Sequence, residues 1–250
     1  MGNRIRFVLC DVDGCLTPED PVAPDAAALA SIARRQQRIA TGEDLAGLTL
    51  CTGRPQPFAE LLCRMLHVRL PLIAENGVWL YDPVRNRYLI DPAIGADDLA
   101  AVDACREWLR TALAGSLADG AIQPGKTASV SLYSSDHAAL AAALPRVQAQ
   151  VQAAGWPIRV SMSWYYINCD LGHISKATGI ARWRGLVGAE AQELAGIGDT
   201  LGDLAIADSV AVFACPANAD ERLKTRAAYV AAAREAAGVA EILDHLDRRR

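Results

Sequence analysis

The chain has 250 residues, of which 52% are hydrophobic, 22% charged and 6% aromatic. This balance is typical of a globular protein with one large or two small domains, and it excludes global disorder. The 25 basic and 29 acidic side chains give a formal net charge of −4, which argues against sequence-independent binding of nucleic acid. No apolar run reaches the roughly 18 residues of a membrane span, so we expect no membrane association.

The seven cysteines are scattered along the chain and include no C-x-x-C pair. This pattern indicates reduced thiols that fill the core, rather than a disulfide framework or a zinc site. The first residues also lack the apolar region of a signal peptide. Together these features predict a cytoplasmic protein.

The first third of the chain alternates short apolar runs with helical segments. Strands separated by helices predict βαβ units and a parallel sheet. We expect strands at residues 6–10, 48–51 and 72–74, and helices at 24–40 and 55–67.

The pattern changes after residue 76. Residues 77–81 and 87–90 flank a turn and predict a hairpin. Beyond it, the sequence predicts helices at 96–114 and 136–154 and strands at 121–123, 128–133, 158–162 and 164–168. The order α-β-β-α-β-β is typical of an antiparallel sheet with helices on one face.

After Asp170 the alternation of strands and helices returns. Helices are expected at residues 175–184, 203–208 and 239–246, and strands at 194–197 and 210–214. The simplest organisation is an α/β core formed by residues 1–82 and 166–250, with an α+β module inserted at 83–165.

Pairs of carboxylates follow two of the predicted strands. Asp11 and Asp13 come directly after the first strand, and Asp199 and Asp203 follow a strand of the last third. A parallel sheet places its active site at such strand ends. In the first pair, one carboxylate could attack a phosphorus atom while the other moves a proton. The second pair suits Mg²⁺, which prefers carboxylate oxygens. Taken singly, each pair also fits a turn or a helix cap.

Two further segments occupy comparable positions. Thr52, Gly53 and Arg54 follow the second strand, where a hydroxyl and backbone N–H groups can hold phosphate oxygens. Lys176 begins a helix, a position where a cation is unfavourable unless an anion lies nearby. By themselves these residues also fit an ordinary loop and a solvated lysine.

Taken together, Asp-x-Asp-Gly, Thr-Gly-Arg, a lone Lys and Gly-Asp-x-x-x-Asp resemble the signature of the haloacid dehalogenase superfamily of phosphohydrolases. The long insertion and the Glu75-Asn76-Gly77 turn before it resemble the Cof-like branch with a type IIB cap. That branch includes sugar-phosphate, sucrose-phosphate, mannosylphosphoglycerate and phosphoglycolate phosphatases. The resemblance implies an α/β fold, a Rossmann-like core with a parallel sheet, and an inserted α+β cap that sets specificity.

The resemblance also implies a role for each motif residue. Asp11 would be the nucleophile that forms an aspartyl-phosphate, and Asp13 the general acid and then the base. Thr52 would bond the transferring phosphoryl group, and Lys176 would neutralise charge. Mg²⁺ would be held by the Asp11 carboxylate, the Asp13 carbonyl and Asp199, with Asp203 as a further ligand or a supporting acid.

Three positions depart from the family pattern. Cys15 stands where threonine is common, Ala177 where glycine is usual, and Gly202 where the branch usually has asparagine. The last change leaves the metal motif one polar residue short. The acid at Asp13 implies hydrolysis or transfer of phosphate esters, rather than dehalogenation or P-type ATPase chemistry.

Candidate substrate-binding residues come from both parts of the chain. Gly53, Arg54 and Asn76 lie by motif at the rim of the core. In the cap, Ser129 lies on the same strand face as two other hydroxyl-bearing residues and close in sequence to Lys126. These groups would suit a polyhydroxy or carboxylated ligand, although a solvent-facing strand has the same pattern.

The expected function is a Mg²⁺-dependent phosphatase for a small phosphorylated metabolite, a sugar phosphate or a phosphorylated hydroxy acid. One alternative is a phosphomannomutase-like phosphoryl transferase, which would need a more basic cap. The other is a non-catalytic binding module on the same fold. The sequence leaves the substrate and the oligomeric state, monomer or dimer, open.

Overall fold

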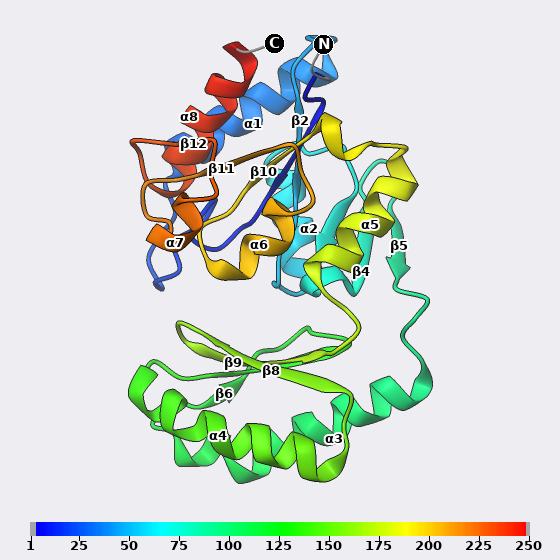
Figure 1. The fold of residues 1–250 in the computed structure, drawn as a ribbon, viewed down its shortest axis with the longest axis vertical. Helices are drawn as coiled ribbons and strands as arrows, with labels where there is room; N and C mark the ends of the chain where they lie inside the picture. Colours follow the sequence, from blue (N-terminus) through cyan, green and yellow to red (C-terminus); the bar gives the residue numbers. More distant parts are fainter. Residues whose placement is uncertain (1–3, 249–250) are drawn as a thin grey trace. The chain divides into compact units, whose positions relative to one another are not determined.

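The computed structural model describes residues 4–248, which form two compact units (Figure 1). The first unit contains residues 4–89 and 176–248, and the second contains 90–175. Both boundaries lie further along the chain than the expected positions at 83 and 165. The hairpin strand that begins at Arg87 belongs mostly to the first unit, and the strand that ends at Leu171 belongs to the second.

A parallel sheet with the strand order β12-β11-β10-β1-β2 forms the centre of the first unit. Its strands are β1 (Phe7–Cys10), β2 (Gly47–Leu50), β10 (Leu194–Ile197), β11 (Val212–Cys215) and β12 (Tyr229–Val230). Cys10, the last residue of β1, lies beside Leu50 on one side and Ile197 on the other. The connections leave β1 and β10 in opposite directions, so their carboxyl ends form the switch point at which such sheets bind ligands.

Helices cover both faces of this sheet. They are α1 (Ala26–Ala40), α2 (Gln56–Met65), α5 (Lys176–Val187), α6 (Leu204–Ala207), α7 (Glu221–Lys224) and α8 (Glu235–Arg248), with short 3₁₀ helices η1 (Glu75–Gly77), η3 (Ala191–Glu193) and η4 (Leu201–Asp203). Val8 and Cys10 of β1 pack into one apolar cluster, whereas Phe7 and Leu9 pack into another. This alternation explains why the strand is apolar throughout, since both faces are buried.

The strand expected at residues 72–74 pairs differently from the rest of the parallel sheet. β3 (Leu72–Ala74) joins the parallel strands through a bridge between Cys51 and Ile73, and it pairs antiparallel with β4 (Trp79–Asp82). β5 (Arg87–Ile90) completes a three-stranded sheet, and β4 and β5 form the hairpin that the sequence predicts. The chain reverses between β3 and β4 because η1 adopts left-handed backbone angles.

The second unit has the predicted α-β-β-α-β-β order. Its elements are α3 (Ala96–Ala112), η2 (Ala114–Ser116), β6 (Ala121–Ile122), β7 (Ser129–Tyr133), α4 (His137–Ala154), β8 (Ile158–Ser163) and β9 (Tyr166–Leu171). The strands form an antiparallel sheet in the order β6-β7-β9-β8, and α3 and α4 lie on one face of it (Figure 1). The fold class predicted from the sequence is confirmed.

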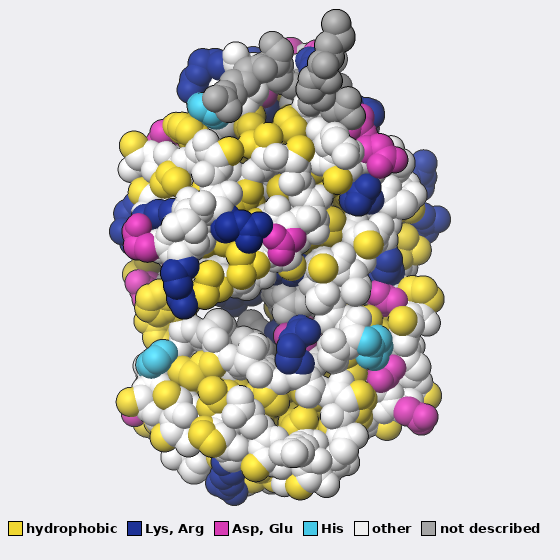
Figure 2. Space-filling view, viewed as in Figure 1, with side chains coloured by type: hydrophobic (Ala, Val, Ile, Leu, Met, Phe, Trp, Pro, Cys, Tyr) yellow, Lys and Arg dark blue, Asp and Glu magenta, His cyan; other side chains and the backbone are white. Residues whose placement is uncertain are grey.

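All seven cysteines are buried and free, as their scattered positions indicated. Within the described part of the chain, no helix is long and apolar enough to cross a membrane. On the face shown in Figure 2, basic and acidic side chains are interspersed with apolar ones.

Candidate active site

Lys176 links two of the predicted acidic residues. Its Nζ lies 2.9 Å from Oδ1 of Asp11 and 2.7 Å from Oδ1 of Asp203. The Lys176 side chain is 10% exposed, so it is not the solvated lysine that its segment alone also allowed. Asp11 follows β1, Lys176 begins α5 and Asp203 ends η4, so three distant segments converge at the carboxyl edge of the sheet.

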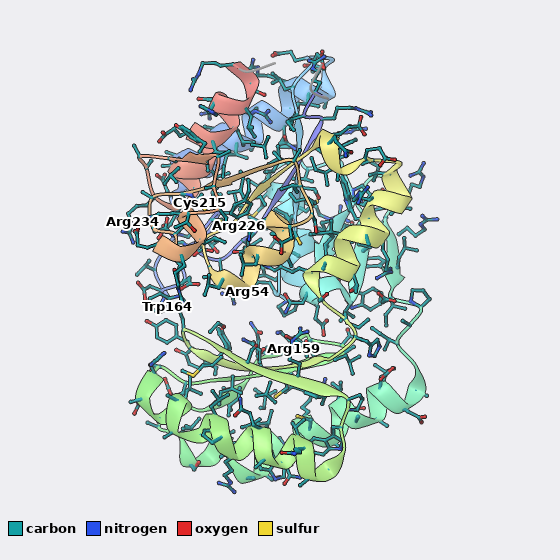
Figure 3. The ribbon with its side chains drawn as sticks, in the orientation of Figure 1. Arg54, Arg159, Trp164, Cys215, Arg226 and Arg234 are labelled. Atoms are coloured by element: carbon teal, nitrogen blue, oxygen red, sulfur yellow. The ribbon has the colours of Figure 1, made fainter. Side chains whose placement is uncertain are left out.

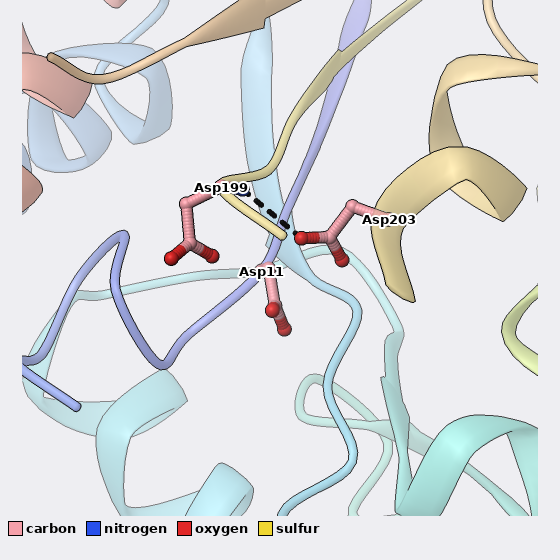
Figure 4. A group of neighbouring side chains, drawn as sticks. All are labelled: Asp11, Asp199 and Asp203. Atoms are coloured by element: carbon pink, nitrogen blue, oxygen red, sulfur yellow. Dashed lines mark hydrogen bonds between the residues drawn. The ribbon is translucent and has the colours of Figure 1, made fainter. Parts of the chain in front are cut away.

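Asp11, Asp199 and Asp203 form a buried acidic cluster (Figure 4), with one oxygen from each lying within 4.8 Å of the others. Burial and the negative charge of Asp203 raise the pKa of Asp11 to about 7. Burial and the charges of Asp11 and Asp203 raise the pKa of Asp199 to about 9. Burial alone would lower the pKa of Lys176, but the charges of Asp11 and Asp203 hold it well above its usual range.

The cluster fits a divalent cation. Its three carboxylates outnumber the one lysine beside them, so a bound cation would relieve the repulsion that raises the two carboxyl pKa values. Carboxylate oxygens are also the ligands that Mg²⁺ prefers. Asp203 accepts hydrogen bonds from the backbone N–H groups of Asp199 at 3.0 Å and Thr200 at 3.2 Å, so it holds the loop that presents Asp199. Direct coordination by Asp203 remains a prediction.

Gly14 leaves room for the Asp199 carboxylate. Its φ is +70°, and a Cβ built there would lie 1.9 Å from Oδ2 of Asp199. We therefore expect Gly14→Ala to displace Asp199 and to lower both metal affinity and turnover by roughly 10-fold to 100-fold, in addition to a backbone cost of about 1–2 kcal/mol. Isothermal titration with Mg²⁺, steady-state turnover and thermal melting would measure these three effects.

The matched control is Gly188→Ala. Gly188 has a similar φ of +68°, but a Cβ there meets nothing within 4 Å. The control should therefore lose stability to backbone strain alone and keep its metal affinity. Equal metal affinity in the two variants would contradict the steric role of Gly14.

Asp13 and Arg54 form an ion pair beside the cluster. Nη2 of Arg54 lies 2.6 Å from Oδ1 of Asp13, and Nε lies 2.9 Å from Oδ1 and 2.8 Å from Oδ2. The two side chains are about one-quarter exposed. The structure thus brings the predicted acid–base residue together with the arginine of the second motif.

A strained turn supports the loop that carries Thr52, Gly53 and Arg54. Glu75 and Asn76 have φ values of +50° and +52°, which non-glycine residues rarely adopt. The N–H of Glu75 donates to the carbonyl of Arg54, and that of Asn76 to the carbonyl of Thr52, each at 3.0 Å. A Cβ at Gly53 would lie 3.1 Å from Oδ1 of Asn76, so these two predicted residues are packed together.

The remaining predicted residues, Lys126 and Ser129, belong to the second unit. Nζ of Lys126 donates to Oγ of Ser131 at 2.7 Å, and that hydroxyl lies 2.6 Å from Oδ1 of Asn168 on β9. Ser129 is buried and pairs with Asp170 across the sheet. Arg159 and Trp164, labelled in Figure 3, come from β8 and the β8–β9 turn of the same unit.

Sequence reasoning missed Asn218, in the loop after β11. Its Nδ2 donates to the carbonyl of Gly14 at 2.8 Å, and its Oδ1 accepts from the N–H of Glu235 at 2.8 Å. Asn218 therefore ties the first motif to the beginning of α8. Its position after another strand of the parallel sheet was the signal that could have identified it.

Glu19 was also missed. Burial and the charges of Asp13 and Asp11 raise its pKa to about 8. Cys15, one of the three departures from the family pattern, lies beside the site, with its Sγ 3.9 Å from Oδ1 of Asp199.

Solved structures from several organisms are similar to this chain in fold. A protein of Thermoplasma acidophilum has a TM-score of 0.76 at 19% identity, with 98% of this chain and 99% of that one covered. A haloacid dehalogenase-like hydrolase of Bacteroides thetaiotaomicron has a TM-score of 0.73 at 17% identity, covering 97% and 100%. The sucrose-phosphatase of Synechocystis, solved with sucrose and phosphate, has a TM-score of 0.68 at 17% identity, covering 98% and 99%. No curated protein sequence matches the chain.

The chain is therefore an α/β protein with an α+β unit inserted into its sequence. Its parallel sheet has a buried carboxylate centre at the switch point, where Lys176 bridges two aspartates. Residues 121–243 match the family model of the haloacid dehalogenase-like hydrolases. This match covers just under half of the chain, and solved haloacid dehalogenase-like structures share the fold of the whole chain.

Proposed function

We propose that the protein is a Mg²⁺-dependent phosphatase that hydrolyses a small phosphorylated metabolite through an aspartyl-phosphate on Asp11. The contact of Lys176 with both Asp11 and Asp203 is the observation that carries this proposal, because it fixes a nucleophilic carboxylate beside a permanent cation. Phosphoryl transfer depends mainly on such positioning and charge neutralisation.

The proposed reaction has two steps. An Asp11 oxygen attacks phosphorus, the ester P–O bond breaks, and the leaving alcohol takes a proton from Asp13. Water then attacks the aspartyl-phosphate and gives a proton to Asp13, which releases phosphate and restores Asp11. Thr52 would bond the phosphoryl oxygens. Mg²⁺, held by Asp11, the Asp13 carbonyl and Asp199 with Asp203, would neutralise phosphoryl charge.

We propose a sugar phosphate or a phosphorylated hydroxy acid as substrate. The linked polar groups around Lys126 and Ser131, with Ser129 on the same strand, support recognition of hydroxyl or carboxylate groups by the second unit. The seven free, buried thiols support a reducing compartment such as the cytoplasm.

Phosphate release from a panel of phosphate esters, with Mg²⁺ and with EDTA, tests this function. The panel would contain sugar phosphates, sucrose 6-phosphate, phosphoglycolate, mannosylphosphoglycerate and an aryl phosphate. We expect metal-dependent release that is fastest for one compound. A folded protein that binds Mg²⁺ but releases no phosphate would overturn the proposal and favour the phosphomutase or the binding module.

A further inference from the structure

The Asp13 carboxylate is held unevenly at its two oxygens. Oδ1 receives Nη2 of Arg54 at 2.6 Å and Nε at 2.9 Å, and the hydroxyl of Thr17 lies 3.5 Å away. Among the described residues, Oδ2 receives a hydrogen bond only from Nε of Arg54, at 2.8 Å. Both oxygens are held by the guanidinium, but Oδ1 has three donors beside it and Oδ2 has one, so Oδ2 has more capacity left for a proton.

Arg54 is itself held in place. Its N–H donates to Oγ1 of Thr52 at 3.1 Å, and its carbonyl accepts from the N–H of Glu75 in the left-handed turn. Its guanidinium lies over the Phe58 ring, 5.2 Å from the ring centroid. The planar fork of arginine loses less entropy for each hydrogen bond than a flexible ammonium group would. These contacts make Arg54 a fixed support for the acid.

We propose that Arg54 is the positioning residue for Asp13, an inference that rests on the proposed phosphatase activity. Arg54 anchors Oδ1 so that Oδ2 carries the mobile proton in both steps. In the first step the Oδ2–H bond breaks as the O–H bond of the leaving alcohol forms. In the second an O–H bond of water breaks and the Oδ2–H bond forms again. The anchor at Oδ1 persists in both protonation states, because Oδ1 accepts throughout.

This assignment differs from the motif-based expectation that Arg54 binds the substrate. A residue that binds substrate affects esters of one size and shape alike. A residue that positions the general acid matters most where the leaving group most needs a proton. The two roles therefore separate in a series of aryl phosphates of similar shape but different leaving-group acidity.

The test compares kcat/KM for 4-nitrophenyl, phenyl and 4-methoxyphenyl phosphate, since kcat/KM reports the steps up to release of the phenol. For Arg54→Met we expect 4-nitrophenyl phosphate to change by about 3-fold or less and 4-methoxyphenyl phosphate to lose roughly 100-fold, the range of a misplaced general acid. Arg54→Lys keeps the charge without the fork and should recover part of the loss. Arg64→Met, which removes an arginine paired with Glu60 on α2, should match the wild type.

The outcomes separate a positioning role of Arg54 from a substrate-binding role. A steeper dependence on leaving-group acidity in Arg54→Met supports the assignment, because a general loss of folding would lower all three rates alike. An equal loss across the series overturns it while leaving the phosphatase proposal intact. A wild-type protein that hydrolyses no phosphate ester overturns both proposals.

Discussion

Asp11→Asn should lower kcat by at least about 10³-fold while leaving the fold intact, since the amide cannot attack phosphorus. The substitution preserves the shape of a buried side chain that Lys176 contacts at 2.9 Å. It also removes a carboxylate whose ionisation burial disfavours, as its pKa of about 7 indicates. We therefore expect the melting temperature without metal to stay the same or rise. Acid quenching during turnover of a labelled ester should trap phosphoryl label on the wild type and none on the variant.

Asp208→Asn provides the control for this substitution. It makes the same chemical change in the first unit, at an exposed carboxylate paired with Arg226. Turnover and trapped label should match the wild type there. Phosphoryl label on Asp11→Asn, or turnover within 10-fold of the wild type, would contradict a nucleophilic Asp11.

The convergence of Asp11, Thr52 and Asp199 could be predicted because each of them follows a strand of the parallel sheet. The carboxyl ends of β1, β2 and β10 meet at one edge, so Asp11, Thr52 and Asp199 had to lie there whatever the details of packing. A local pattern of strands and helices was enough to specify that arrangement. The same reasoning gave the order of elements in the second unit.

Other features depend on contacts that no local pattern encodes. The reversal between β3 and β4 requires left-handed backbone at Glu75 and Asn76, and only the glycine that follows them signals it. The pairing of Arg54 with Asp13 spans 41 residues, and it depends on how two loops face each other. Asn218 lies further from the first motif in sequence, in a segment whose composition resembles an ordinary turn.

The stability of the metal-free protein should fall as the pH rises, and Mg²⁺ should reverse that fall. Asp11 and Asp199 have pKa values of about 7 and about 9 in the folded protein, above the ordinary value of 3.8. Between pH 3.8 and about pH 9 these two carboxyl groups bind more protons in the folded state than in the unfolded state. The free energy of unfolding of the protein therefore decreases as the pH rises. Their stabilising contribution is complete below about pH 4 and is lost as the pH passes the folded values.

A divalent cation competes with these protons for the same oxygens, so its affinity should increase over the same range of pH. At a Mg²⁺ concentration about 100 times the dissociation constant, binding contributes about 2.7 kcal/mol, which raises the melting temperature of a protein of this size by roughly 5–10 °C. Melting curves at pH 5, 7 and 9, with Mg²⁺ and with EDTA, would measure both trends.

Asp199→Asn decides whether the acidic cluster causes this behaviour. The substitution removes one carboxylate that faces Asp11 and Asp203, so the metal-free protein should melt higher at pH 9 and respond little to Mg²⁺. Asp208→Asn should keep the full Mg²⁺ response, because its carboxylate is 61% exposed and paired with Arg226. A Mg²⁺ shift that is the same at pH 5 and pH 9, or that survives in Asp199→Asn, would mean that the cation binds somewhere other than the cluster at the end of β10.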